Sequence, residues 1–158
     1  MTRIEIREIT VADAGEVLTV QRAAFVSEAQ IYGDPAQPPL TQTLVQLEAE
    51  LRDARGFVAV LDQRIIGAVR GDENDGVLQI GRIAVAPDAQ GSGVGRLLLE
   101  AMEDATECAE AELFTGSLSE ANLRLYSECG YRVIERIDQG DGTAQVFMRK
   151  KLDERDHP

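Results

Sequence analysis

Three glycines, Gly91, Gly93 and Gly95, stand at alternate positions between an apolar run that ends at Pro87 and an amphipathic helical pattern. Glycine has no side chain, so the backbone N–H groups of such a loop can approach a ligand closely. A helix N-terminus adds unpaired N–H donors and a partial positive charge. Together these features predict a binding site for a phosphate or pyrophosphate group.

The spacing of these glycines excludes the two best-known phosphate loops. A P-loop requires Gly-x-x-x-x-Gly-Lys-Ser/Thr, but Arg96 and Leu97 follow the last glycine, and the only lysines are Lys150 and Lys151. A dinucleotide loop requires Gly-x-Gly-x-x-Gly after the first strand. Here the third glycine comes one position early and the loop lies past the middle of the chain. A nucleotide-binding protein therefore fails on loop spacing.

Two motifs in the second half of the chain resemble those of one enzyme family. From Gln90 the loop reads Gln-x-x-Gly-x-Gly, and residues 122–131 read Asn-Leu-Arg-Leu-Tyr-Ser-Glu-Cys-Gly-Tyr. With the apolar run at residues 78–86, they resemble the acyl-CoA loop, the Asn-x-x-x-Tyr-x-x-x-Gly-Phe/Tyr element and the central strand of the GNAT N-acetyltransferase superfamily. The resemblance is specific over residues 78–131 and covers the rest in element order only.

The resemblance implies that the chain binds acetyl-CoA as a co-substrate and needs no metal. The pyrophosphate would lie on backbone N–H groups of the loop, and the end of the central strand would pair with the pantetheine arm. The cofactor-binding residues expected on this basis are Ile83, Ala84, Val85, Gln90, Gly91, Ser92, Gly93, Val94, Gly95, Arg96 and Asn122. Hydrogen bonds to charged groups contribute roughly 1.5–3 kcal/mol each, so several of them can anchor the cofactor without a lysine.

The resemblance also implies a catalytic role for Tyr126, which would donate a proton to the departing CoA thiolate. Asn122 and Tyr126 are four residues apart, so they share one face of the helix expected here. A phenol with a pKa near 10 is largely protonated at neutral pH, as a proton donor must be. Taken alone, the same residues would fit an amphipathic helix with a buried tyrosine.

Several groups are candidates for the base that deprotonates the acceptor amine. Some family members carry a glutamate on the central strand, where this chain has Gln79, which takes up no proton at useful pH. The alternatives are a water chain or one of the carboxylates of Glu28, Asp34, Asp72, Glu73 and Asp75. A base is unnecessary for an acceptor amine of low pKa. The only histidine, His157, lies in the C-terminal tail and is not expected to be catalytic.

Acidic side chains gather in the two segments that border the acceptor pocket in the family topology, a loop at residues 30–39 and a turn at residues 72–75. With Tyr32 they form a set that would attract a positive charge. We therefore hypothesise that the acceptor is a small-molecule amine that carries a positive charge.

Composition indicates one globular domain with few classes of partner. The chain has 158 residues, a net charge of −12 and two cysteines. Such acidity argues against nucleic acid as a partner. No apolar run would span a membrane, and no signal-peptide pattern is present. We expect a cytoplasmic protein with one acyl-CoA N-acyltransferase domain at residues 1–152 and a charged tail at residues 153–158, and a homodimer is compatible with this interpretation.

Periodicity predicts alternating strands and helices of mixed α/β (α+β) class. Strands are expected at residues 2–9, 57–61, 64–70, 77–86, 112–117, 131–137 and 144–151. Helices are expected from residue 10 to before Gly33, and at residues 41–54, 94–108 and 120–128. This order matches a GNAT-like fold, in which helices flank a mixed, mostly antiparallel sheet whose central strands splay apart.

The function favoured by the sequence is transfer of an acetyl group from acetyl-CoA to a primary amine by direct attack in a ternary complex. The alternative is a noncatalytic acyl-CoA-binding or interaction module on the same fold, since a fold does not determine a function. Tyr126 favours the enzyme, whereas the absence of an obvious base leaves room for the alternative.

Overall fold

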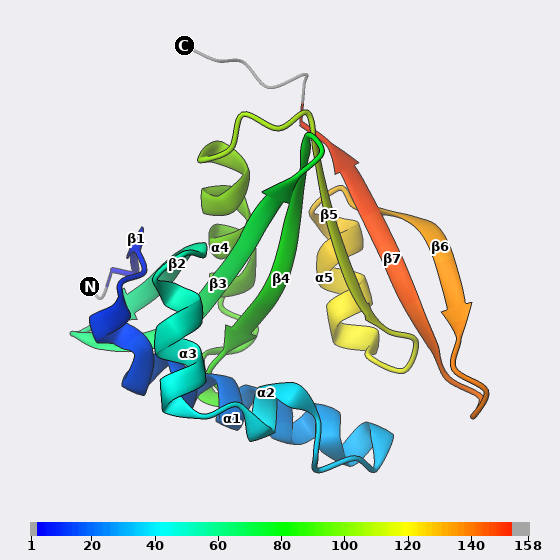
Figure 1. Ribbon diagram of the computed structural model, residues 1–158, viewed down its shortest axis with the longest axis horizontal. Coiled ribbons are helices and arrows are strands. Elements are labelled where there is room, and N and C mark those ends of the chain that lie inside the picture. The colour runs from blue at the N-terminus through cyan, green and yellow to red at the C-terminus, as the bar shows by residue number, and fades with distance from the viewer. Residues whose placement is uncertain (1–2, 153–158) are drawn as a thin grey trace.

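The computed structural model describes residues 3–152, so the expected tail at residues 153–158 and His157 lie outside the described residues. Seven strands form one sheet in the order β1-β2-β3-β4-β5-β7-β6 (Figure 1). The strands are β1 Glu5–Glu8, β2 Arg55–Leu61, β3 Arg64–Asn74, β4 Val77–Val85, β5 Glu110–Gly116, β6 Arg132–Asp138 and β7 Ala144–Lys151. The helices are α1 Ala14–Tyr32, α2 Pro38–Thr41, α3 Leu44–Leu51, α4 Val94–Asp104 and α5 Glu120–Glu128, with 3-10 turns η1 Val11–Asp13 and η2 Pro87–Ala89.

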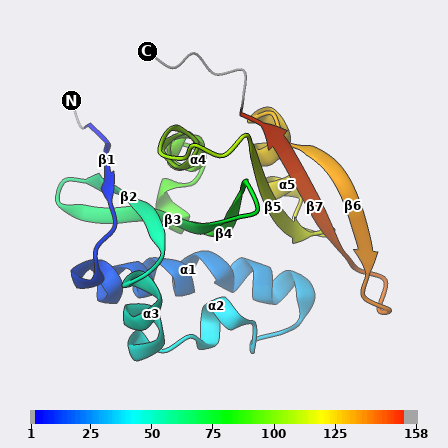
Figure 2. The same ribbon diagram turned by 45° about the horizontal axis from the view of Figure 1, so that its top comes forward.

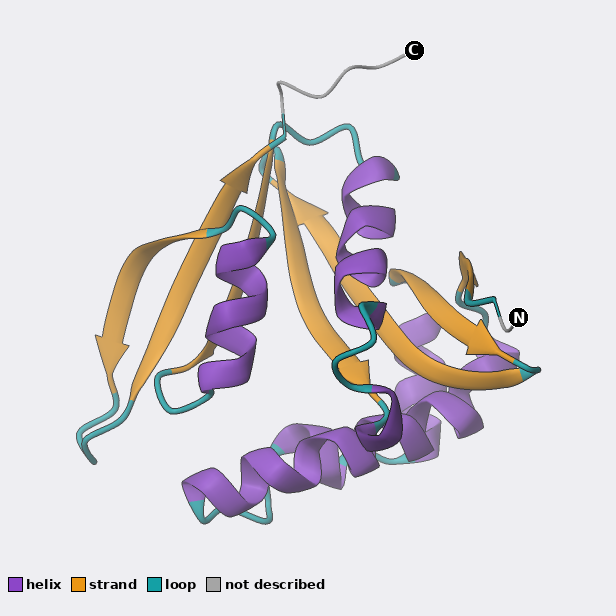
Figure 3. Ribbon diagram, turned by 180° about the vertical axis from the view of Figure 1, so that it is seen from behind, coloured by secondary structure: helices purple, strands orange, loops and turns teal. Residues whose placement is uncertain are grey.

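The centre of the sheet opens between β4 and β5. These two strands are parallel and pair only over three residues of each, with Val77 opposite Glu110 and Gln79 opposite Glu112. Beyond this point they diverge, which divides the sheet into a β1–β4 half and a β5–β7–β6 half (Figures 1 and 3). All other neighbouring strands are antiparallel. The expected mixed, mostly antiparallel sheet with splayed central strands is confirmed.

Helices cover both faces of the sheet. Figure 2 shows α1, α2 and α3 on one face and α4 and α5 on the other. The apolar stripe of α4, with Val94, Leu98 and Met102 at four-residue spacing, is at most 1% exposed and packs against the β-sheet. Helices α1 and α3 bury a separate cluster around Val17 and Leu47. A core of apolar side chains therefore lies on each face of the sheet.

A β-bulge interrupts β4 at Gly81. Arg82 lies opposite Arg70 of β3, but Ile80 lies opposite Gly71, so Gly81 has no partner in the ladder. An extra residue in one strand changes which face the following side chains occupy. Ile80 packs in the core beneath α4, whereas Ala84, four positions further on, packs in the core beneath α1 and α3.

Several element boundaries differ from those expected from the sequence. Helix α1 ends before Gly33 as expected, at a left-handed φ of 64° typical of a helix end, but its last turn takes up the start of the loop expected at residues 30–39. The segment expected to be a loop contains α2, because proline fits the first turn of a helix, where no N–H is needed. Strand β3 continues to Asn74, because it pairs with β4 along the whole hairpin.

Among residues 3–152, no helix is long and apolar enough to cross a membrane.

Candidate active site

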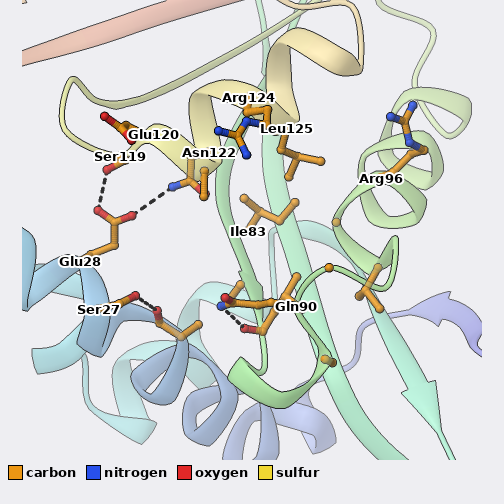
Figure 4. A pocket seen from close by; sticks show the side chains of 18 of the residues that line it. Ser27, Glu28, Ile83, Gln90, Arg96, Ser119, Glu120, Asn122, Arg124 and Leu125 are labelled. Atoms are coloured by element: carbon orange, nitrogen blue, oxygen red, sulfur yellow. Dashed lines mark hydrogen bonds between the residues drawn. The ribbon is translucent and has the colours of Figure 1, made fainter.

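Two pockets meet where β4 and β5 part. The first, here called the loop pocket, has a volume of about 520 Å³ and lies between the second half of β4, the glycine loop with the first turn of α4, and α5 (Figure 4). The second, here called the tyrosine pocket, has a volume of about 540 Å³ and lies between the C-terminal end of α1, β4 and β5. Phe25, Glu28, Ile83 and Asn122 line both pockets. The volumes of the two pockets are typical of small-molecule binding sites.

The glycine loop has a backbone that requires glycine at two positions. Gly91 and Gly93 have φ angles of 82° and 89°, a conformation that residues with a side chain rarely adopt. No atom lies within 4 Å of the position that a Cβ would occupy, so the requirement for glycine comes from the backbone conformation. The first hydrogen bond of α4 runs from Leu97 N to Gly93 O at 3.1 Å. The three preceding N–H groups therefore have no partner within the helix and can bind an anion.

Gly95 has a second role, in helix packing. A Cβ at this position would lie 2.9 Å from Cδ2 of Leu125, so the absence of a side chain lets α4 and α5 approach. Arg96 of α4 and Arg124 of α5 lie on opposite sides of the loop pocket (Figure 4). The weak 3.9 Å ion pair of Arg96 with Glu128 is exposed. Sequence reasoning missed Arg124, although it lies within the Asn-x-x-x-Tyr motif.

The other polar side chains of the loop bond back to the chain itself. Gln90 Nε2 donates to the Val85 carbonyl oxygen at 3.3 Å, and the Ser92 hydroxyl donates to the Ala89 carbonyl oxygen. These bonds hold the loop against the end of β4. All the expected cofactor-binding residues line the loop pocket except Ser92.

Strand β4 presents an unpaired backbone edge toward the opening. Residues 83–85 pair with β3 on one side, but pairing with β5 ends at Gln79. An edge strand exposes N–H and C=O groups that bind an added extended chain. Ile83, Ala84 and Val85, which the sequence predicts to pair with the pantetheine arm, all line the loop pocket along this open edge.

Glu28 of α1 lies at the junction of the two pockets and is fixed by two hydrogen bonds. Ser119 Oγ donates to it at 2.6 Å and Asn122 Nδ2 at 3.2 Å (Figure 4). Asn122 Nδ2 also lies 3.3 Å from Thr115 Oγ1, and the Tyr32 hydroxyl lies 2.9 Å from Ser119 Oγ. Of the carboxylates proposed as a base, Glu28 is the one at which both pockets meet.

Tyr126 of α5 is 3% exposed and lines the tyrosine pocket. Burial, and then the negative charge of Glu28, raise the pKa of Tyr126 well above its usual value. Its hydroxyl has no hydrogen-bond partner within residues 3–152. Tyr126 therefore carries a proton at neutral pH, and its hydroxyl is not engaged by another described side chain.

Only some of the residues expected to form an acidic border of the acceptor pocket lie together in the structure. Tyr32 and Asp34 line the tyrosine pocket. Asp72, Glu73 and Asp75 do not, because the long β3–β4 hairpin carries them to the end where β4 and β5 pair. Glu73 there accepts a hydrogen bond from Thr106, which lowers the pKa of Glu73. Gln79, on the same hairpin, lies 3.5 Å from Glu112.

The tyrosine pocket also contains a cation, Arg82 of β4, that sequence reasoning missed. Burial, and then the like charge of Arg70, lower the pKa of Arg82. Glu50 of α3 forms an ion pair with Arg70. The pocket is thus acidic at Glu28 and basic at Arg82. Within residues 3–152 no cluster of His, Cys, Asp or Glu has the arrangement of a metal site.

The parted sheet, the glycine loop and the edge of β4 define a GNAT fold, and comparison with known proteins agrees. Residues 23–131 match the family model described as the acetyltransferase (GNAT) family. The chain belongs to this family.

Two curated relatives share about a third or less of their residues with the chain over the matched segments. YqkA of Bacillus subtilis (strain 168), named a UPF0157 protein, is 29% identical over 137 residues, which cover 86% of this chain and 39% of YqkA. MnaT of Escherichia coli (strain K12), named an L-amino acid N-acyltransferase, is 33% identical over 84 residues, covering 48% of this chain and 49% of MnaT. The chain thus spans half or less of the length of these curated relatives.

Solved structures share the fold at lower identity. The structure of yncA from Salmonella typhimurium, solved with its cofactor acetyl-CoA, superposes with a TM-score of 0.72 at 22% identity, covering 99% of this chain and 98% of that one.

Proposed function

We propose that the protein transfers an acetyl group from acetyl-CoA to the primary amine of a small molecule, by direct attack in a ternary complex. The meeting of the loop pocket and the tyrosine pocket at Glu28 and Asn122 carries this proposal. Membership of the acetyltransferase family supports it, as do the acetyl-CoA bound by yncA and the acyltransferase name of MnaT. The free thiols of Cys108 and Cys129 suit the reducing cytoplasm, where we propose that the protein acts.

In this proposal the loop pocket holds acetyl-CoA. The N–H groups of residues 94–96 bind the pyrophosphate, and Arg96 and Arg124 add positive charge beside it. The open edge of β4 binds the pantetheine arm, which carries the acetyl group toward Ile83. The co-substrate supplies an activated thioester, so the chain's main task is to position the two reactants.

The tyrosine pocket holds the amine, and two side chains move its protons. Glu28, oriented by Ser119 and Asn122, takes a proton from the ammonium group, which leaves a nitrogen lone pair free to attack the thioester carbon. The C–S bond breaks, and the departing sulfur takes the hydroxyl proton of Tyr126. The second proton that the nitrogen loses as the amide forms returns to the Tyr126 oxygen, which restores the hydroxyl. A backbone N–H of the open β4 edge is available for the carbonyl oxygen as its negative charge grows.

Release of CoA thiol from acetyl-CoA, measured with a library of primary amines, tests the proposal. We expect thiol release that depends on particular amines, with the acetylated amine detected by mass spectrometry. Binding of acetyl-CoA, measured by calorimetry, without thiol release for any amine would refute the enzyme and favour a noncatalytic acyl-CoA-binding module. The same preparation, analysed by light scattering, tests whether the protein is a homodimer.

A further inference from the structure

Arg82 lines the tyrosine pocket without a bonding partner. In the part of the chain that the structure describes, no hydrogen bond or ion pair reaches its guanidinium. The pocket's own carboxylates are engaged elsewhere. Asp34 accepts from the Ala36 N–H at 3.0 Å, and Asp141 accepts from the Thr143 N–H at 3.0 Å and from its hydroxyl at 2.6 Å, each within its own turn.

The neighbourhood of Arg82 carries an excess of positive charge. Arg82 and Arg70 are directly opposite one another on β4 and β3, an arrangement that is unfavourable for like charges. The negative charge of Glu50 attracts both guanidinium groups. Its hydrogen bond and ion pair, however, are formed with Arg70. Arg70 is also bonded to Gln42 at 3.2 Å. A half-buried charge without a partner is unfavourable, so an anion at Arg82 would be stabilising.

The backbone builds this position. The bulge at Gly81 separates Arg82 from the face that Ile80 occupies and places it near Glu50 and Arg70. Opposite the bulge, a Cβ at Gly71 would lie 2.2 Å from the Gln79 carbonyl oxygen, so no larger residue fits there. The bulge at Gly81 in β4 and the glycine opposite it in β3 therefore together place Arg82 at the tyrosine pocket.

Two opposite charges thus lie at different places in one pocket, Glu28 at the junction with the loop pocket and Arg82 on β4. From this arrangement we infer that the acceptor is an amino acid, whose amine lies beside Glu28 and whose carboxylate is bound by Arg82. A planar guanidinium matches a carboxylate with two parallel hydrogen bonds. The inference rests on the proposed N-acetyltransferase function and names the acceptor class of that same site. The acceptor hypothesised from the sequence carries a positive charge only, whereas the acceptor inferred here also carries a negative charge.

The test compares each amino acid with its carboxamide, which keeps the amine and loses the negative charge. We expect the wild-type protein to use its best amino acid with a kcat/KM about 10- to 100-fold above that of the carboxamide, as for a hydrogen-bonded charge pair. Arg82→Gln should reduce the ratio to about one by raising KM for the amino acid, and Arg82→Lys should retain part of it. Arg136→Gln, which removes a charge from exposed strand β6, is the matched control and should leave the ratio unchanged.

The outcomes separate this inference from the proposed function. Acetyl transfer at equal rates to amino acids and their carboxamides by the wild-type protein would overturn the role of Arg82 and leave the enzyme standing. No thiol release with any amine would overturn both. The wild-type comparison needs no variant, and a shift of the melting temperature by acetyl-CoA shows that each variant is folded.

Discussion

Glutamine at position 28 would keep the hydrogen bonds around this side chain while removing its capacity to take up a proton. Glu28 accepts from Ser119 at 2.6 Å and from Asn122 at 3.2 Å. In Glu28→Gln the amide oxygen can face Asn122, whose Nδ2 only donates. The amide nitrogen can face the Ser119 hydroxyl, which accepts as well as donates. The variant therefore tests the proton transfer apart from the network.

The expected loss follows from the role of the carboxylate. General-base catalysis contributes about 10²- to 10⁴-fold, so kcat of Glu28→Gln should fall by about that factor. Stability should change little, because both hydrogen bonds remain. Glu28→Ala, by contrast, removes both hydrogen bonds to the carboxylate, each of which contributes about 1.5–3 kcal/mol as a bond to a charged group, and leaves Ser119 with Tyr32 and Asn122 with Thr115 as partners. Comparison of the two variants separates the loss of the base from the loss of the network.

The assay is steady-state thiol release with the acceptor that the wild-type protein uses best, together with calorimetric binding of acetyl-CoA. Glu135→Gln removes the same charge from exposed β6 and serves as the control. An acceptor whose amine pKa lies below the assay pH arrives without the extra proton, so the defect of Glu28→Gln should shrink with it. A kcat equal to that of wild type with an ordinary amine would refute the assignment of Glu28.

Further predictions concern the proton donor, the loop and alkaline pH. Tyr126→Phe should lower kcat by about 10²-fold or more while calorimetry shows acetyl-CoA binding nearly unchanged, and an unchanged kcat would remove Tyr126 from the acid role. Gly93→Ala places a Cβ at a φ of 89°, which costs about 1–2 kcal/mol and should lower the melting temperature by about 2–8 °C; a wild-type melting temperature would contradict this. Burial raises the pKa of Tyr126 and of Tyr131, so both keep their protons in the folded state. Their contribution to stability is therefore full below about pH 10, where tyrosine ionises in the unfolded chain, and declines above it. Thermal melts across this range should show the decline, and a melting temperature that rises above pH 10 would disprove it.

The parts of the site that were predictable from the sequence depend on local geometry. A left-handed φ at Gly91 and Gly93 is a property of two residues, and it is visible as glycine spacing. Asn122 and Tyr126 share a helix, so their common face follows from a four-residue separation. The order of strands and helices followed in the same way from short periodic patterns.

The remaining parts depend on contacts between distant segments. Glu28 stands out among the carboxylates because Ser119 and Asn122 lie beside it, more than 90 residues further along the chain. The exposure of Arg82 to the pocket depends on the bulge at Gly81, which a pattern of strict alternation cannot reveal. Asp72 was placed at the wrong end of the sheet, because the length of the β3–β4 hairpin decides where its turn lies.

Because β4 and β5 pair over so short a length, this pairing is a pivot about which the two halves of the sheet can rotate. Three residues on each strand form the pivot, and the pairing of β4 with β5 ends there. A rotation of a few degrees at the pivot displaces the far ends most, and there the Tyr32 hydroxyl bonds Ser119 and the Leu118 N–H, at 2.9 and 3.0 Å. These bonds act with the longest lever arm. The Tyr32 hydroxyl on α1, together with the Glu28 carboxylate, therefore joins the two halves of the sheet at the end remote from the pivot.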